Sequence, residues 1–262
     1  MPKYNKIGKE YNLNRSADTR IIKQLIQLLN LQKGSLIADI GAGTGNYSNE
    51  LATHGFHVHA IEPSDLMISQ AKKNPNVVWI KGTAEEVKLK KCFYDGIVST
   101  LAFHHFNSID KALSNIHKAL KQEGVLVIFG ADPRRIDDKC WFKEYFGNMI
   151  KNSENTYIDV FKLIEKAESI FDETVTYKTF NVPYDIEDGF FYAGWQKPEK
   201  YLEENFRKSI SVFAKSSNEL ISNSVSKLYK DLHDGTWDKK FGHVRNQKEY
   251  NGGYYFLRVK RK

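Results

Sequence analysis

The segment that decides the fold is Leu36-Ile-Ala-Asp-Ile-Gly-Ala-Gly-Thr-Gly-Asn-Tyr-Ser48. An apolar run passes directly into glycines at positions 41, 43 and 45, and a stretch that can begin a helix follows. Glycines lack Cβ atoms, so the backbone can turn tightly there and a ligand can touch the main chain. The loop is not a P-loop, because Asn46 stands where that motif needs lysine, and the third glycine of the dinucleotide fingerprint would also fall at position 46. The segment predicts a ligand-binding turn between a buried strand and a helix.

The residues around this loop alternate short apolar runs with helical patterns, which is typical of a parallel sheet covered by helices. We expect helices over 18–30, 46–53, 64–73 and 108–122, and strands over 35–40, 57–61, 77–80, 94–99 and 125–130. Gly124 is expected to end the last of these helices, because helix ends favour a left-handed residue. The strand after it is wholly apolar, which indicates a place in the interior of the sheet.

The second half of the chain has longer, aromatic and charged segments. We predict helices over 157–171 and 197–230, and strands over 174–182 and 253–259. The two strands would pair at an edge of the sheet. Residues 133–170 and 185–245 would then be insertions over the carboxyl ends of the strands, where open α/β sheets bind ligands. The predicted organisation is a core over 1–132, followed by 133–262 with helical lid insertions and the last two strands.

Composition limits the class of protein. Of the 262 residues 41% are hydrophobic and 27% charged, which excludes a disordered or fibrous chain. No apolar run approaches the roughly 20 residues of a membrane helix, and the polar N-terminus lacks an apolar signal core; we therefore expect a cytoplasmic protein without membrane insertion. The net charge of +7 is spread along the chain, which argues against a nucleic-acid partner. No feature predicts the oligomeric state.

Acidic residues at strand ends suggest what the glycine loop holds. Asp39 ends the first predicted strand and Glu62 the second, where a carboxylate can accept hydrogen bonds from both hydroxyls of a ribose. The small turn of Gly82, Thr83, Ala84 and Glu85 follows the third strand and offers backbone donors beside an adenine ring. These positions predict a nucleoside-binding site.

Together these motifs resemble the class I S-adenosylmethionine-dependent methyltransferases, in the small-molecule group that includes ubiquinone and menaquinone methyltransferases. The resemblance rests on DIGAGTG at 39–45, IEPSDLM at 61–67, GTAEE at 82–86, STLAFHHF at 99–106 and LKQEGVLVIFG at 120–130. It implies a Rossmann-like, doubly wound α/β sheet of seven strands, mostly parallel with an antiparallel last strand. It also implies S-adenosyl-L-methionine as the cofactor.

The resemblance assigns roles to the residues at the strand ends. Gly41, Gly43 and Gly45 would wrap the methionine moiety of the cofactor. Asp39 would orient its ammonium, and Glu62 would hold its ribose.

The other implied cofactor contacts surround the adenine, the sulfonium and the amino-acid tail. The residues implied to flank the adenine are Pro63, Leu66, Met67 and Ala84. Those implied to line the sulfonium end are Thr100 and Leu101, and those implied to reach the cofactor from the N-terminal segment are Tyr11 and Arg15.

His104 and His105 follow the fourth strand near the expected point of methyl transfer, and they are the candidate catalytic residues. A base or an orienting group could act there, although the same pair could instead only shape the site. We expect no metal, because adjacent histidines point in different directions and no third ligand recurs nearby.

The expected function is methyl transfer from S-adenosylmethionine to a small organic acceptor. One alternative is an RNA or tRNA base methyltransferase, suggested by the basic charge; against it, lysine precedes both Cys92 and Cys140, so the Pro-Cys nucleophile is missing. Another alternative is a non-catalytic, cofactor-binding regulatory protein on the same scaffold. Aromatic clusters at 141–146 and 190–195 either pack a helical core or line an acceptor pocket.

Overall fold

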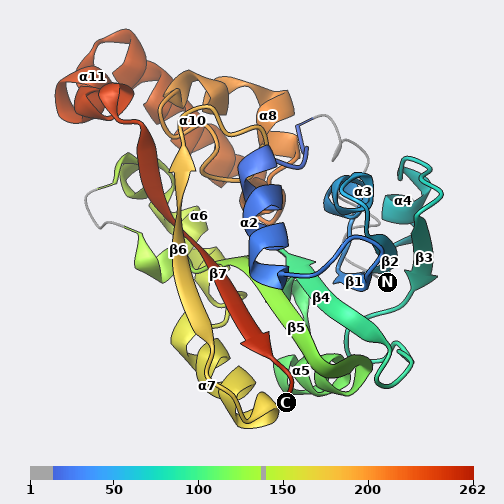
Figure 1. The fold of residues 1–262 in the computed structure, drawn as a ribbon. Helices are drawn as coiled ribbons and strands as arrows, with labels where there is room; N and C mark the ends of the chain where they lie inside the picture. Colours follow the sequence, from blue (N-terminus) through green and yellow to red (C-terminus); the bar gives the residue numbers. More distant parts are fainter. Residues whose placement is uncertain (1–13, 137–139) are drawn as a thin grey trace.

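A seven-stranded sheet forms the centre of the protein, in a computed structural model that describes residues 14–136 and 140–262 (Figure 1). The strands are β1 (Leu36–Ile40), β2 (His57–Glu62), β3 (Val77–Lys81), β4 (Tyr94–Thr100), β5 (Leu120–Ala131), β6 (Thr176–Pro183) and β7 (Glu249–Lys260). Their order across the sheet is β3-β2-β1-β4-β5-β7-β6. β1 to β5 are parallel, whereas β7 is antiparallel to both neighbours, β5 and β6. The predicted fold class is confirmed, including the antiparallel last strand.

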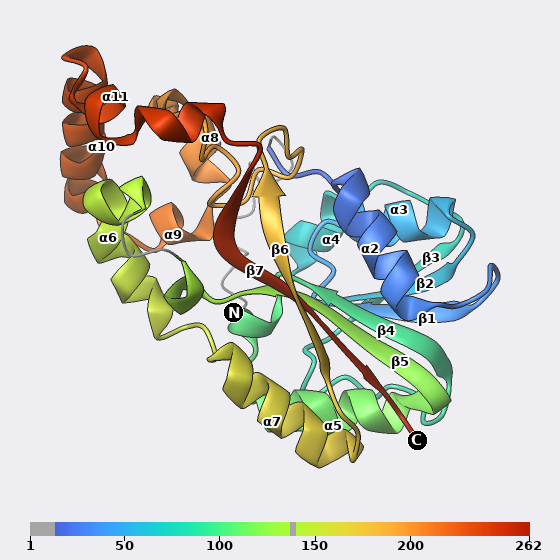
Figure 2. The same ribbon diagram turned by 60° about the vertical axis from the view of Figure 1, so that its left-hand side comes forward.

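Helices cover both faces of the sheet (Figure 2). One face carries α2 and α3 and the other carries α5 and α7, with the bounds Thr19–Leu29, Asn46–Thr53, Ile109–Ala119 and Val160–Phe171. α2 begins at the cap Asp18, whose side chain accepts the backbone N–H of Arg20 at 2.9 Å. Its apolar residues Ile21 and Leu25 are fully buried. The helical spacing of apolar residues therefore did predict the layer on this face.

The boundary between α5 and β5 differs from the prediction. α5 ends at Ala119, and Leu120 is already extended and pairs with Tyr94 of β4. The left-handed residue is Glu123, with φ +66°, and not Gly124. Leu120 is fully buried, so its side chain gains more from packing in the sheet layer than from prolonging the helix.

The predicted helix over 64–73 is shorter in the structure, where α4 spans Asp65–Ser69. Ser64 caps it by accepting the backbone N–H of Met67 at 3.3 Å. Met67 is buried, but residues 70–73 bury no side chain fully. Without an apolar face to pack, the helix does not continue.

The chain between β5 and β6 and between β6 and β7 folds mainly into helices. Besides α7, they are η3 (Pro133–Arg135), α6 (Trp141–Glu154), η4 (Pro198–Leu202), α8 (Glu204–Lys208), α9 (Ser211–Ala214), α10 (Asn218–His233), α11 (Thr236–Phe241) and η5 (Gly242–Asn246). The predicted single helix over 197–230 is wrong, because the chain is extended at Glu203, Ile210 and Ser217. Buried aromatic side chains from these helices pack on one another, and Trp141, Phe142 and Tyr201 are fully buried.

The helices α6, α8, α10 and α11 gather beyond one end of the sheet, the end toward which the β6 arrow points (Figure 1). Because β7 is antiparallel to both β5 and β6, this is also the end where β1 to β5 finish. The insertions therefore stand over the carboxyl ends of the strands. In the part of the chain that the structure describes, none of the helices has the length and apolarity to cross a membrane.

Candidate functional site

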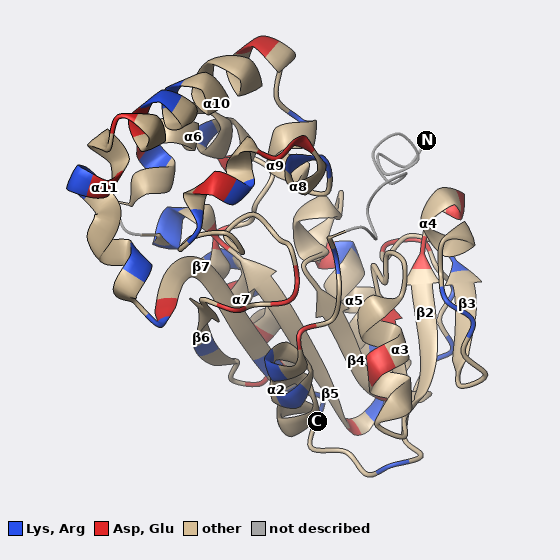
Figure 3. Ribbon diagram, turned by 90° about the horizontal axis from the view of Figure 1, so that it is seen from above, with Lys and Arg blue, Asp and Glu red and all other residues tan. Residues whose placement is uncertain are grey.

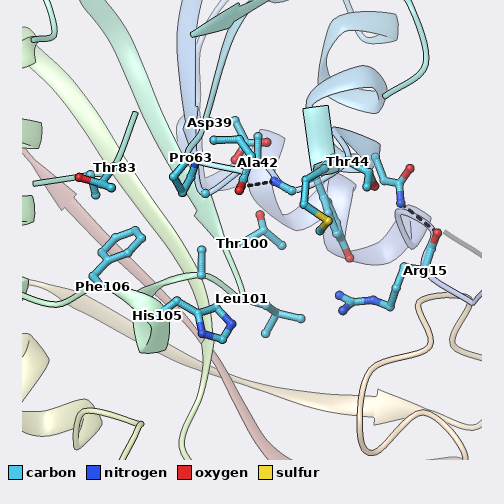
Figure 4. A pocket seen from close by; sticks show the side chains of 18 of the residues that line it. Arg15, Asp39, Ala42, Thr44, Pro63, Thr83, Thr100, Leu101, His105 and Phe106 are labelled. Atoms are coloured by element: carbon cyan, nitrogen blue, oxygen red, sulfur yellow. Dashed lines mark hydrogen bonds between the residues drawn. The ribbon is translucent and has the colours of Figure 1, made fainter. Parts of the chain in front are cut away.

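A cavity of about 430 Å³ lies at the carboxyl ends of β1, β2 and β4 (Figure 4). Its walls are the glycine loop after β1, the turns after β2 and β3, and the segment after β4. Arg15 and Ser16, ahead of α2, and Asp188, between β6 and β7, complete the lining. β1 and β4 are the neighbours at which the strand order reverses, which is where open α/β sheets bind ligands.

The glycine loop needs its glycines for space as well as for backbone conformation. Gly41, Gly43 and Gly45 have φ values of +77°, +60° and +79°. A Cβ on Gly41 would lie 2.4 Å from the Cβ of Ala102, and one on Gly45 would lie 2.7 Å from Trp79. Gly41 and Gly43 line the cavity, so a ligand there touches main chain. Gly45 lies outside the lining and caps α3.

Glu62, at the end of β2, fixes the loop. Its side chain is buried, and its two carboxylate oxygens accept the backbone N–H groups of Gly43 at 3.0 Å and Ser64 at 2.9 Å. Burial raises the pKa of Glu62, the two backbone hydrogen bonds oppose the rise, and the nearby Asp39 adds to it. Each carboxylate oxygen has a second lone pair, so Glu62 can also accept hydrogen bonds from a ligand in the cavity.

Asp39 has an unsatisfied oxygen at the edge of the cavity. The residue is 1% exposed, and its Oδ2 accepts a hydrogen bond from the Ser48 hydroxyl at 2.6 Å. Among the described residues, Oδ1 has no partner, and neither do the buried hydroxyls of Thr83 and Thr100, which also line the cavity. Burial raises the pKa of Asp39 to about 6, and the Ser48 hydrogen bond opposes this rise. A cationic donor in the cavity would satisfy the free oxygen.

Hydrogen bonds from α5 and from the residues just before it fix the turn after β3. The Asn115 amide donates to the carbonyl oxygens of Ala84 and Glu85, at 3.1 and 2.7 Å. The Glu85 carboxylate accepts the backbone N–H groups of Asn107 and Ser108, at 2.5 and 3.2 Å. Glu85 therefore links this turn to the N-terminus of α5.

A buried ion pair joins the insertion between β6 and β7 to the cavity. Asp188 is fully buried and accepts from the Arg15 guanidinium, through Nε and, at 3.1 Å, through Nη2. The Tyr47 hydroxyl, from α3, donates to the same carboxylate at 2.9 Å. The Asn46 amide donates to the Arg15 carbonyl at 2.9 Å. Asp188 thus connects three segments that lie far apart in the sequence.

The two histidines occupy different places in η2 (Phe103–His105). His105 lines the cavity, whereas His104 does not. The His104 ring stacks on Tyr157, with centroids 4.4 Å apart and planes 15° apart, and its centroid lies 3.8 Å from that of His105. Burial, and then the charges of His105, Lys215 and Arg15, lower the pKa of His104 well below its usual range. His104 is therefore uncharged near neutral pH.

Most of the site residues predicted from the sequence come together in this cavity. Those in its lining are Arg15, Asp39, Gly41, Gly43, Glu62, Pro63, Met67, Thr83, Ala84, Glu85, Thr100, Leu101 and His105. Gly45, Leu66 and His104 lie outside the lining, and Tyr11 lies outside the described residues. Gly82, of the turn predicted to contact an adenine, also lines the cavity, and the lining residues not predicted are Ser16, Ala42, Thr44, Asn46, Tyr47, Ala102, Phe106, Asn107 and Asp188. Most of these neighbour a predicted residue in the sequence, so extending each motif by one or two positions would have found them; no sequence pattern indicates Asp188.

Comparison with known proteins adds to this geometry. Residues 38–128 match the model of a methyltransferase domain family. The chain is 36% identical over 178 residues to an uncharacterized methyltransferase from Alkaliphilus oremlandii, an alignment that covers 65% of this chain and 74% of the relative.

Solved structures share the architecture. A protein from Anabaena variabilis, assigned as a methyltransferase of an antibiotic biosynthesis pathway, is 35% identical, with a TM-score of 0.90 over 94% of this chain and 98% of that chain. A phosphoethanolamine N-methyltransferase from Haemonchus contortus, in complex with phosphomonomethylethanolamine and S-adenosylhomocysteine, gives a TM-score of 0.60 at 18% identity, over 98% of this chain and 56% of that one. At that identity the second likeness concerns the fold alone.

Proposed function

The chain belongs to the class I S-adenosylmethionine-dependent methyltransferases, and we propose that it methylates a small organic acceptor held between the cavity and the insertions. The observation that carries this proposal is that both insertions reach the cavity or a residue beside it. Asp188 of the second insertion lines it, and Tyr157 of the first stacks on His104 beside it. A site covered in this way favours a small acceptor over a polymer.

The distribution of charge supports the same choice. Figure 3 shows Lys and Arg mixed with Asp and Glu along the helices of the insertions. Several are paired, for example Lys227 and Lys240 with Glu144, and Arg245 with Glu199. A protein that follows a phosphate backbone needs a continuous basic surface. This pattern does not favour the RNA or tRNA alternative.

The residues of the cavity fit S-adenosyl-L-methionine. When bound, the cofactor supplies a methyl group activated on a sulfonium. The unpartnered Oδ1 of Asp39 would accept from its ammonium, and Glu62 would accept from its ribose hydroxyls. Arg15 would place a positive charge near its carboxylate, and the main chain at Gly41 and Gly43 leaves space for its tail.

The protein's own contribution to methyl transfer is to align the acceptor and exclude water. Leu101, which the resemblance places at the sulfonium end, and Phe106 give the cavity apolar walls. His105 lines the same cavity, so it is the group placed to take a proton from an acceptor that must lose one. His104 lies behind His105 and stacks on Tyr157, so we assign it a shaping role.

The direct test of the cofactor site is the melting temperature. S-adenosylhomocysteine should raise it, because a ligand at 100 times its Kd stabilises a folded protein by about 2.7 kcal/mol. NAD should leave the melting temperature unchanged.

The acceptor is tested with cofactor labelled on its methyl group: label should enter the small-molecule fraction of a cell extract and not purified tRNA. Label in tRNA would support the alternative function instead.

Asp39→Asn should separate binding from stability. An ionised Asp39 binds the ammonium, so affinity for S-adenosylhomocysteine should fall as the pH drops below the carboxyl pKa of about 6. The variant should bind weakly at every pH and lose this dependence. A raised carboxyl pKa destabilises the folded state above that pKa, and the penalty disappears as the pH falls below the ordinary value of about 3.9. The variant without cofactor should therefore unfold at higher urea than the parent at pH 7, with no such gain at pH 4.

Asp65→Asn is the matched control for this experiment. Asp65 also follows β2, but it is exposed and its partner is Lys81. Asp65→Asn should leave the pH dependence of S-adenosylhomocysteine binding unchanged. It should change the free energy of unfolding by no more than an exposed ion pair contributes. If Asp39→Asn binds the cofactor as tightly as the parent, the ammonium role of Asp39 is wrong.

A further inference from the structure

Two segments that lie far apart in the sequence meet beside the cavity. Residues 14–20 lead into α2, and residues 185–189 begin the second insertion. The segments run in opposite directions, and the pairs that meet along them are Asn14 with Gly189, Ser16 with Glu187, and Arg20 with Asp185. We call these two segments the clasp. The proposed methyl transfer, as described so far, explains the buried ion pair of the clasp but not the other contacts along it.

Hydrogen bonds hold the clasp together along its length. The backbone N–H of Gly189 donates to the Asn14 carbonyl at 2.8 Å. The Ser16 hydroxyl donates to the Glu187 carbonyl at 2.9 Å, and the backbone N–H of Glu187 donates to the Asp18 carboxylate at 3.0 Å. Asp18 is fully buried and also caps α2. The start of the second insertion is therefore fixed to the N-terminus of a helix that packs on the sheet.

Gly189 allows the two segments to approach this closely. A Cβ on Gly189 would overlap the Asn14 carbonyl oxygen and lie 3.1 Å from the Asn14 Cβ. The φ of Gly189 is not in the left-handed region, so alanine fits the backbone conformation and changes only the space. Alanine at this position would therefore push the segments apart and break the hydrogen bond between them.

The clasp brings a basic side chain to a cavity whose other charged groups are acidic. Among the described residues that line the cavity, Arg15 is the only lysine or arginine, and the acids are Asp39, Glu62, Glu85 and Asp188. Without Arg15, the carboxylate of the cofactor would meet only like charge. Figure 4 shows the Arg15 side chain pointing into the cavity. Asp188 accepts from Nε and Nη2, and a guanidinium has five N–H donors, so Arg15 can bind a second carboxylate.

We propose that the clasp positions Arg15 for the carboxylate of the cofactor, so that cofactor binding and the docking of the second insertion stabilise each other. This inference rests on the proposed methyl transfer from S-adenosylmethionine. A ligand favours the conformation to which it binds more tightly, and the carboxylate gains Arg15 only while the clasp is closed. Gly189 is a positioning residue, because it acts through the place of Arg15. The insertion that covers the acceptor is therefore held most firmly when the cofactor is bound.

The test compares S-adenosylhomocysteine with the analogue that lacks only its carboxylate, by titration calorimetry. The parent should bind the analogue about tenfold or more weakly, the effect of losing hydrogen bonds to a charged group. Gly189→Ala should weaken S-adenosylhomocysteine by about fivefold or more and leave the affinity for the analogue unchanged. General damage to the cavity would instead weaken both ligands equally. Gly147→Ala, in α6, is the matched control, because a Cβ on Gly147 would have nothing within 4 Å.

Hydrogen exchange on the parent protein tests the coupling without any substitution. The backbone amides of Glu187 and Gly189 donate across the clasp, so saturating S-adenosylhomocysteine should slow their exchange by about tenfold or more, and the analogue should not. The Tyr184 amide is the internal control, because it donates to the Lys248 carbonyl at 3.0 Å just outside the clasp. Its exchange should not respond to either ligand.

Four results would overturn the positioning role of the clasp. They are equal binding of the two ligands by the parent, unchanged binding of S-adenosylhomocysteine by Gly189→Ala, equal weakening of both ligands by that variant, and exchange at Glu187 and Gly189 that responds to both ligands or to neither. If Gly189→Ala does not fold, the exchange measurement on the parent decides. A parent protein that does not bind S-adenosylhomocysteine would instead overturn the proposed function.

Discussion

Replacing Asp188 with alanine should lower the free energy of unfolding by about 3–5 kcal/mol, the loss typical of removing one partner from a buried ion pair. Asp188 is fully buried and accepts from the Arg15 guanidinium and from the Tyr47 hydroxyl. Both donors would lose that acceptor, and the Arg15 side chain is only 12% exposed. Urea unfolding, followed by tryptophan fluorescence, measures the change. Because Arg15 and Tyr47 line the cavity, the affinity for S-adenosylhomocysteine should fall as well.

Asp185→Ala is the matched control, because Asp185 is in the same segment and also pairs with an arginine. Its side chain is 54% exposed, and it contacts Arg20 at 2.5 Å on the surface. Exposed pairs of this kind contribute about 0–1 kcal/mol. Equal losses in the two variants would show that the buried pair does not anchor the insertion to the cofactor side of the molecule.

The core of the fold was predictable because its information is local. Each of the strands β1 to β4 is an apolar run flanked by turn residues, and the predicted boundaries agree with the structure within two residues. α3 begins at Asn46 and ends at Thr53, as predicted. Apolar spacing, capping and glycine placement all operate over a few residues, so one sequence is enough to reveal them.

The insertions were less predictable because aromatic side chains decide their structure through distant contacts. Trp141 stacks on Phe142 and meets Tyr201 and Trp237 edge to face, and these residues come from three separate helices, α6, η4 and α11. Such a cluster has no periodicity that indicates where each helix ends. The break at Ile210, which is extended and buried, lies inside a stretch that looks helical by composition.

The residues of the candidate site also differ in whether the sequence alone could reveal them. Asp39 and Glu62 could be found from the sequence, because polar residues at the ends of parallel strands converge at one edge of the sheet. Asp188 could not, since its partners Arg15 and Tyr47 are 173 and 141 positions away. Only the order of the strands brings the segment after β6 back over the N-terminus of α3.

Glu62→Ala should weaken S-adenosylhomocysteine binding by about 1.5–3 kcal/mol, or about 10- to 150-fold in Kd. The carboxylate has two roles: it would accept from the ribose hydroxyls, and it holds the N–H groups of Gly43 and Ser64 that shape the cavity wall. Glu62→Gln separates them. The glutamine side chain has nearly the same shape, but its NH2 group cannot accept a hydrogen bond. One of the two N–H groups therefore loses its partner, and binding should fall by an intermediate amount.

Calorimetry at neutral pH gives the Kd values. Glu50→Ala is the control, because Glu50 is an exposed glutamate on α3. If Glu62→Ala binds like the parent, Glu62 has only a structural role and the ribose lies elsewhere; if Glu62→Gln binds as poorly as Glu62→Ala, charge rather than loop geometry determines the affinity.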